Sequence, residues 1–142
     1  MDIDGLFARA LKAASVSYSP YSLFRVGAAL LCADGSVFTG ANIENRSYGL
    51  TTCAERNALA AAVCAGKRDF SGIVVATPDA EYPVSPCGAC RQVLSEFLPV
   101  EAPVVFGSSA KDLVVTTMGQ LFPHDALHGP LGSVRHLAHG NT

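Results

Sequence analysis

The sequence reads TCAER at residues 52–56 and PCGAC at residues 86–90, and these two stretches contain three of the chain's five cysteines. Each stretch leads into a run of helical pattern, so each places a thiol close to the N-terminus of a predicted helix. A helix N-terminus carries partial positive charge and free N–H groups, which lower the pKa of a thiol. Two such helices side by side would bring Cys53, Cys87 and Cys90 together as thiolates.

Three neighbouring thiolates suit zinc, an ion that prefers tetrahedral coordination by sulfur and nitrogen. With Cys53, Cys87 and Cys90 as the only protein ligands, the fourth position stays free for water, as in catalytic zinc sites. Glu55 would lie beside that water, where a carboxylate can take a proton and return it to a substrate nitrogen. Arg56 would hydrogen-bond a thiolate and offset part of the negative charge. The pattern predicts a hydrolase with one zinc ion per chain.

A structural zinc module is the alternative interpretation of these cysteines. A structural site ordinarily has four protein ligands, and Cys32 or Cys64 could supply the fourth. Both cysteines, however, stand in segments of apolar pattern and are expected in the core. The sequence therefore favours a catalytic zinc ion.

The composition describes a folded chain without the character of a nucleic-acid-binding protein. The 142 residues are 49% hydrophobic and 15% charged, the formal net charge is -2, and the three lysines form no basic run. The apolar runs are too short to span a membrane, and an odd number of cysteines without a leader predicts reduced thiols in the cytoplasm. We expect one domain over residues 1–123 and an accessory or poorly ordered tail over 124–142, which holds all four histidines.

Hydrophobic periodicity predicts one mixed sheet with helices on both faces. The expected helices cover residues 4–15, 53–65, 91–98 and 118–122, and the expected strands cover 24–32, 36–43, 72–76, 103–106 and 113–116. Asp4 is a candidate N-cap for the first helix, and Thr51 or Thr52 for the second. The small residues Gly27, Ala28 and Ala29 indicate that either a helix or a ligand packs closely against their strand. The fold class is α/β, with three layers and five strands.

Further motifs extend the pattern well beyond the cysteines. They read YSPYS from Tyr18, FRVGAA from Phe24, GANIEN from Gly40, CAERNA from Cys53 and SPCGACRQV from Ser85. Over residues 5–106 the chain resembles the zinc-dependent cytidine deaminases of pyrimidine salvage, in their three-cysteine, homotetrameric branch. The resemblance implies hydrolytic deamination of cytidine and 2′-deoxycytidine to uridine and 2′-deoxyuridine plus ammonia, with Glu55 as proton shuttle. It also implies a homotetramer with shared active sites.

The resemblance assigns roles to further residues. The residue matching Phe24 packs on the pyrimidine, and those matching Asn42 and Glu44 bind the ribose 3′-hydroxyl. Backbone groups of the residues matching Ala54 and Ser85 face the base carbonyl and the departing amine. The tyrosine matching Tyr48 lies near the 5′ side of the sugar, across a subunit boundary.

One position departs from the family pattern. The family usually ends with a phenylalanine that reaches over a neighbouring subunit's substrate, and here that place falls on Ala126. A roomier site would admit cytidines substituted at N4 or C5. A cytosine nucleoside antibiotic such as blasticidin S is a further alternative substrate for the same chemistry. The ribose-binding pair Asn42 and Glu44 favours free cytidine over these alternatives.

Overall fold

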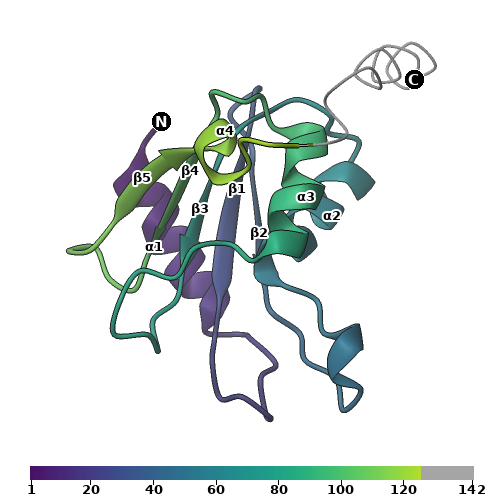
Figure 1. The fold of residues 1–142 in the computed structure, drawn as a ribbon, viewed down its shortest axis with the longest axis vertical. Helices are drawn as coiled ribbons and strands as arrows, with labels where there is room; N and C mark the ends of the chain where they lie inside the picture. The colour runs from purple at the N-terminus through teal and green to yellow at the C-terminus, as the bar shows by residue number, and fades with distance from the viewer. Residues whose placement is uncertain (126–142) are drawn as a thin grey trace.

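The computed structural model describes residues 1–125, and a central sheet organises them (Figure 1). The strands are β1 (Gly27–Cys32), β2 (Val37–Ala41), β3 (Phe70–Ala76), β4 (Pro103–Gly107) and β5 (Val114–Thr117). The helices are α1 (Ile3–Ala14), α2 (Ala54–Cys64), α3 (Gly88–Phe97) and α4 (Met118–Leu121), with a short 3-10 turn η1 at Tyr48–Leu50. Every predicted helix and strand is present, with ends that shift by at most three residues.

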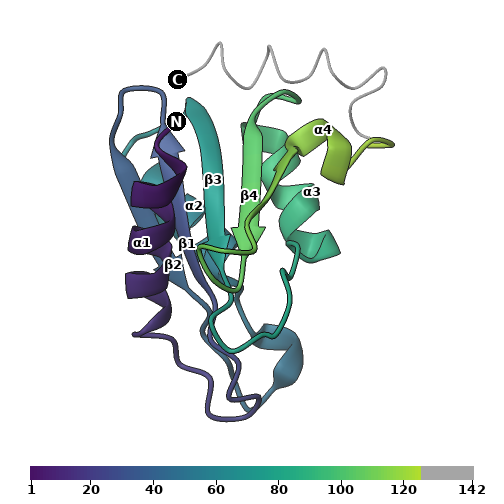
Figure 2. The same cartoon turned by 90° about the vertical axis from the view of Figure 1, so that its left-hand side faces the viewer.

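The strands follow the order β2-β1-β3-β4-β5. Neighbouring strands are antiparallel except β3 and β4, which run parallel. A parallel pair needs a crossover connection, and α3 provides it. Helix α1 covers one face of the sheet, and α2 and α3 cover the other (Figures 1 and 2). The predicted α/β class, with three layers and a mixed five-stranded sheet, is confirmed.

Two apolar clusters join the three layers. Between α1 and the sheet lie Leu6, Phe7, Ala10, Ala29, Val74, Ala76 and Val105. On the side of α2 and α3, the cluster includes Ala28, Leu30, Ala58, Ile73, Val75, Leu94, Val104 and Phe106. Successive residues of β1 and β3 thus alternate between the two clusters, as the period of a strand requires. Because both faces are covered, β1 is apolar throughout its length and β3 is apolar except at the exposed Ser71.

The small residues of β1 make room for a helix. A Cβ atom on Gly27 would lie 1.9 Å from the Ala10 carbonyl oxygen and 2.5 Å from the Ala14 nitrogen, both in the backbone of α1. Ala29 is fully buried in the cluster beneath the same helix. The sequence left open whether a helix or a ligand packs closely against this strand. At Gly27 and Ala29 the close neighbour is the helix α1.

Both predicted helix caps are wrong. Asp2, not Asp4, caps α1, and its carboxylate accepts a hydrogen bond from the Gly5 N–H at 3.0 Å. Because α1 begins at Ile3, Asp4 falls inside the first turn. The N-cap of α2 is Cys53 rather than a threonine, and its side chain makes no capping hydrogen bond. The Cys53 sulfur therefore remains available to other partners.

The two cysteines predicted for the core behave differently. Cys32 is 2% exposed within the cluster beneath α2 and α3, as predicted. Cys64 is exposed, so its predicted burial is wrong. The buried positions of α2 follow a helical period through Ala54, Glu55, Ala58, Leu59 and Ala62. Position 64 lies off that stripe, which explains why an apolar neighbourhood in the sequence did not translate into burial.

The tail predicted over residues 124–142 lies almost wholly outside the described residues, as does Ala126. The domain boundary at residue 123 therefore stays a prediction. Within residues 1–125, none of the helices has the length and apolar character that a membrane span requires.

Replacing Gly27 with alanine is expected to destabilise the protein, because the added methyl group would meet the backbone of α1 rather than a movable side chain. Overpacking of this kind costs about 1–3 kcal/mol, so the midpoint of thermal unfolding should fall by several degrees. Thermal unfolding followed by circular dichroism measures the change. Gly49→Ala is the matched control, since a Cβ atom there would meet nothing within 4 Å. An equal loss in both variants would contradict the packing argument.

Candidate active site

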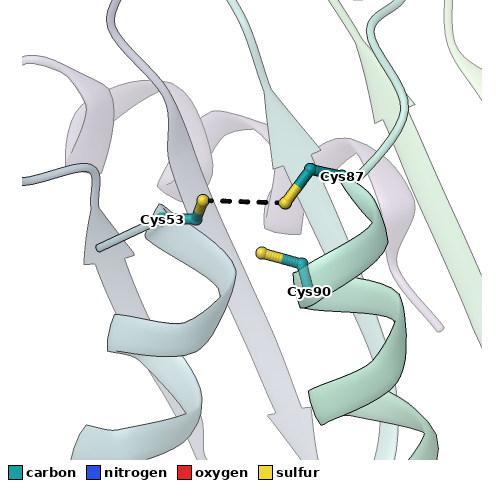
Figure 3. A group of neighbouring side chains, drawn as sticks. All are labelled: Cys53, Cys87 and Cys90. Atoms are coloured by element: carbon teal, nitrogen blue, oxygen red, sulfur yellow. Dashed lines mark hydrogen bonds between the residues drawn. The ribbon is translucent and has the colours of Figure 1, made fainter. Parts of the chain in front are cut away.

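Three thiols meet where α2 and α3 begin. Cys53 and Cys87 are the N-cap residues of the two helices, and Cys90 lies in the first turn of α3. Their sulfurs point toward one another across the gap between the helices (Figure 3). All three Sγ atoms lie within 4.8 Å of one another, and those of Cys53 and Cys87 are 3.8 Å apart. Within residues 1–125, this is the one group of three or more potential metal ligands.

The spacing of these sulfurs fits a zinc ion. Two Zn–S bonds of about 2.3 Å at a tetrahedral angle separate their sulfurs by about 3.8 Å, which matches the 3.8 Å between Cys53 and Cys87. Both residues are half-buried or exposed, whereas Cys90 is fully buried beneath them. The chemistry of three soft donors and the geometry of the cluster agree on one zinc ion per chain.

The pKa shifts of the thiols also favour a cation in the cluster. Hydrogen bonding from the Cys90 thiol, helped by the Arg56 guanidinium, lowers the pKa of Cys53 to about 5. The same hydrogen bond, with burial, raises the pKa of Cys90. One sulfur thus ionises while its neighbour keeps its proton, because two thiolates in contact repel each other. A divalent cation among the sulfurs would allow both to ionise.

Arg56 stands behind the cluster on the first turn of α2. Its Nη2 donates a hydrogen bond to the Cys53 sulfur at 3.1 Å, and this contact is the main reason that the pKa of Arg56 is raised. The guanidinium therefore sits where the sequence predicts a positive charge beside a thiolate.

Glu55 is a carboxyl group buried beside the thiols. It is only 4% exposed, and burial raises its pKa. It belongs to the first turn of α2, one residue beyond the helix start. A carboxyl group with a raised pKa holds a proton more readily than a free carboxyl group and can pass it on, as general acid–base catalysis requires.

A cavity lies beside the thiol cluster and Glu55. Its lining consists of Phe24, Val26, Cys53, Glu55, Val75, Thr77, Val84, Ser85, Pro86 and Cys87. Five of the predicted site residues, from three separate segments of the chain, therefore share one space of about 130 Å³. Ala54 is buried between Cys53 and Glu55 at the start of α2. The walls of the cavity are mainly apolar.

Asn42 holds the Phe24 segment in place. Its Nδ2 donates to the Phe24 carbonyl at 2.8 Å, and its Oδ1 accepts from the Val26 N–H at 2.9 Å. The Ser17 hydroxyl donates to the same Oδ1. Asn42 is 8% exposed, so its side chain serves the backbone beside the cavity. Its predicted contact with ribose stays a prediction.

Glu44 and Tyr48 line a second pocket, together with Tyr21, Ser22 and Thr51. One Glu44 oxygen accepts from the Tyr21 and Ser22 N–H groups, and the other accepts from the Ser22 hydroxyl. The hydrogen bond from that hydroxyl is the main reason that the pKa of Glu44 is lowered. Ser22 also accepts from the Phe24 N–H at 3.0 Å, so one serine connects the second pocket to the first.

Two supporting residues were missed in the sequence. Arg91 donates from Nε to the Pro86 carbonyl at 2.8 Å, from Nη2 to the Ser85 hydroxyl at 2.8 Å, and from Nη1 to the Leu121 carbonyl at 2.9 Å. Asn57 donates to the Ala41 carbonyl at 2.8 Å. Each stands four positions after a zinc-ligand cysteine, hence one helical turn along, and that spacing could have pointed to both.

Comparisons with known proteins agree with this geometry. A family model described as the cytidine and deoxycytidylate deaminase zinc-binding region matches residues 2–107. A protein named cytidine deaminase from Halalkalibacterium halodurans is 50% identical over 123 residues, which cover 87% of this chain and 92% of that protein. A blasticidin-S deaminase from Bacillus cereus is 36% identical over 105 residues, which cover 69% of this chain and 74% of that protein.

A solved structure extends the likeness to three dimensions. The crystal structure of cytidine deaminase from Burkholderia pseudomallei is 46% identical and has a TM-score of 0.83. The match covers 87% of this chain and 98% of that one. With its three thiols, its buried glutamate and this breadth of similarity, the chain belongs to the cytidine and deoxycytidylate deaminase family.

Proposed function

We propose that this protein hydrolyses cytidine and 2′-deoxycytidine to uridine and 2′-deoxyuridine with release of ammonia. The observation that carries the proposal is the buried Glu55 carboxyl beside Cys53 and Cys87 in one cavity. Family membership and the cytidine deaminases among the relatives support the same activity. The reaction exchanges the C4 amino group of the base for an oxygen atom from water.

Cys53, Cys87 and Cys90 would hold the zinc ion, which as a Lewis acid would make water a stronger nucleophile. Glu55 moves the protons. Its raised pKa suits it to take a proton from the attacking water, to place one on N3 of the base and to assist the departing amine. Arg56 offsets the charge of the thiolates from outside the cavity.

The remaining site residues are proposed to bind the substrate. Phe24 forms a wall of the cavity and would pack on the pyrimidine ring. Backbone groups of Ala54 and Ser85 would face the base carbonyl and the departing amine. Asn42 and Glu44 would receive the ribose 3′-hydroxyl, and Tyr48 would lie toward the 5′ side. The two pockets, connected through a single serine, are consistent with a base in one and a sugar in the other.

Free cytidine is the favoured substrate over a cytosine nucleoside antibiotic. The relatives named for cytidine are the more similar ones, at 50% against 36% identity for the blasticidin-S deaminase. Substituted cytidines remain the second candidate, on the single ground that Ala126 stands where the family has an aromatic residue.

We also propose that the chain assembles as a homotetramer with shared active sites, in the cytoplasm. Large apolar side chains are exposed on the two loops beside the cavity, and we call this set the loop patch: Tyr18, Tyr21, Leu23, Ile43, Tyr48 and Leu50. The rings of Tyr21 and Tyr48 join the loops, with centroids 5.7 Å apart. Several large exposed apolar side chains on these two loops support burial against another copy. Thiols that must stay reduced to bind metal support the cytoplasm.

Glu55→Gln should abolish deamination while leaving zinc in place. The amide is nearly isosteric but cannot carry the proton, so we expect a loss of at least about 10²-fold in kcat. Absorbance-monitored loss of cytidine, with metal analysis of each preparation, measures both quantities. The exposed Glu101→Gln serves as control. A zinc-loaded wild type that turns over only N4- or C5-substituted cytidines would contradict the choice of free cytidine.

Cys87→Ala should lose zinc and activity together, because the site would keep only two thiolates. Cys64→Ala removes an exposed cysteine outside the cluster and should retain both. Zinc per chain and cytidine turnover are compared for the two variants and for wild type after chelation and re-addition of zinc. Full activity of the chelated enzyme would overturn a catalytic role for the metal.

Light scattering on a sizing column should give the mass of about four 14.7-kDa chains. Leu50→Glu introduces a charge into the loop patch, where the side chain is 69% exposed, and should shift the protein to smaller species. Val115→Glu is the control, since Val115 is 61% exposed on β5 and lies outside the loop patch. A monomeric wild type would contradict the assembly.

A further inference from the structure

The segment before β1 carries two walls of the cavity. Phe24 and Val26 both line it, and Arg25 between them extends away, with 47% of its side chain exposed. Asn42 binds the Phe24 carbonyl and the Val26 N–H, which point to the same edge of this extended segment. The Arg25 N–H points to the opposite edge.

Asp79 occupies that opposite edge. The register of β1 and β3 pairs Gly27 with Ala76, so the same register continued by two positions would set Arg25 opposite Pro78. The strand β3 ends at Ala76, and Pro78 has no N–H to donate to the Arg25 carbonyl, so the regular ladder does not reach this position. The Asp79 carboxylate accepts from the Arg25 N–H at 2.8 Å instead. A side chain thus continues the attachment of the segment where the backbone of β3 no longer can.

The two side chains also form a two-pronged ion pair. Arg25 Nε donates to Asp79 Oδ2 at 3.0 Å, and Nη2 donates to Oδ1 at 2.7 Å. With the backbone contact, the carboxylate receives three hydrogen bonds from one residue. The guanidinium is the main reason that the pKa of Asp79 is lowered to about 2, so the pair stays charged across the working range of pH.

Asp79 lies in a part of the chain that also lines the cavity. Thr77, two residues before it, and Val84 and Ser85, after it, all line the cavity. The ion pair therefore connects the segment that contributes Phe24 to the cavity with the loop that contributes Ser85. Residues 1–125 contain one other ion pair, between Lys67 and Asp34, and neither partner lines the cavity.

We propose that Arg25 and Asp79 are a positioning pair for deamination, which sets the separation between Phe24 and the loop opposite it and so determines how firmly the base is held. The inference rests on the proposed function, because it takes the base to lie between these walls. Exposed ion pairs usually contribute little to stability. This pair matters through the geometry that it fixes, since small displacements of binding groups weaken a productive complex.

Steady-state kinetics of zinc-loaded variants test the proposal. Arg25→Gln and Asp79→Asn should each raise the KM for cytidine about 3- to 10-fold, with less than about a twofold change in kcat. Arg25→Lys keeps the charge but not the two-pronged geometry, so its KM should lie between those of wild type and Arg25→Gln. The double variant should resemble the single ones, because either change already breaks the pair.

Lys67→Gln provides the matched control, since it breaks the other ion pair and should leave KM unchanged. Zinc content and the unfolding midpoint are measured for each protein. Unchanged KM in both the Arg25 and Asp79 variants would overturn the proposal. Loss of zinc, or a fall in kcat equal to the rise in KM, would overturn it in favour of a merely structural pair. An inactive wild type would instead refute the deaminase function, so the two failures are distinguishable.

Discussion

Two helices begin so close together that the side chains of their N-cap cysteines meet, and the site is built on this arrangement. Cys53 and Cys87 can bring their sulfurs to 3.8 Å only because α2 and α3 start at the same end of the same sheet face. Close packing beneath α2 helps to make this possible. A Cβ atom on Gly40 of β2 would lie 2.5 Å from the Ala54 carbonyl oxygen, so glycine lets the first turn of the helix rest directly on the strand. The catalytic cluster is thus a consequence of backbone packing.

The sequence predicted those parts of the molecule that local pattern determines. Periodicity gave the layers and all five strands, and the cysteine motifs gave the metal ligands, because residues within one helical turn have a fixed relation in space. Cys64 shows that local pattern does not determine whether a single helical side chain is buried. Its neighbours in the sequence are apolar, yet burial depends on which stripe of α2 faces the sheet, and one helical position decides that.

Contacts between distant segments were the other part that the sequence could not give. Arg25 and Asp79 are 54 positions apart, and nothing in the FRVGAA motif around Arg25 indicates Asp79 as its partner. Only the register of β1 against β3, and the proline that interrupts it, brings them together. Arg91 likewise reaches Leu121 across 30 positions. These pairs follow from the completed fold, and, unlike the cysteine motifs, neither pair has a residue pattern that indicates the partner.

The polar residues around the cavity share a further property that bears on how the site works. Asn42, Glu44, Asp79 and Arg91 each make at least one hydrogen bond with a backbone group of a segment that carries lining residues. Such contacts fix the walls before a substrate arrives, and a preformed site loses less conformational freedom on binding. A nucleoside is small, so its contacts contribute little binding free energy to offset the entropy lost when loops become ordered. We infer that the cavity walls of this chain become ordered during folding, through buried and bridging polar side chains. The chemistry at Glu55 then starts from walls that are already in place.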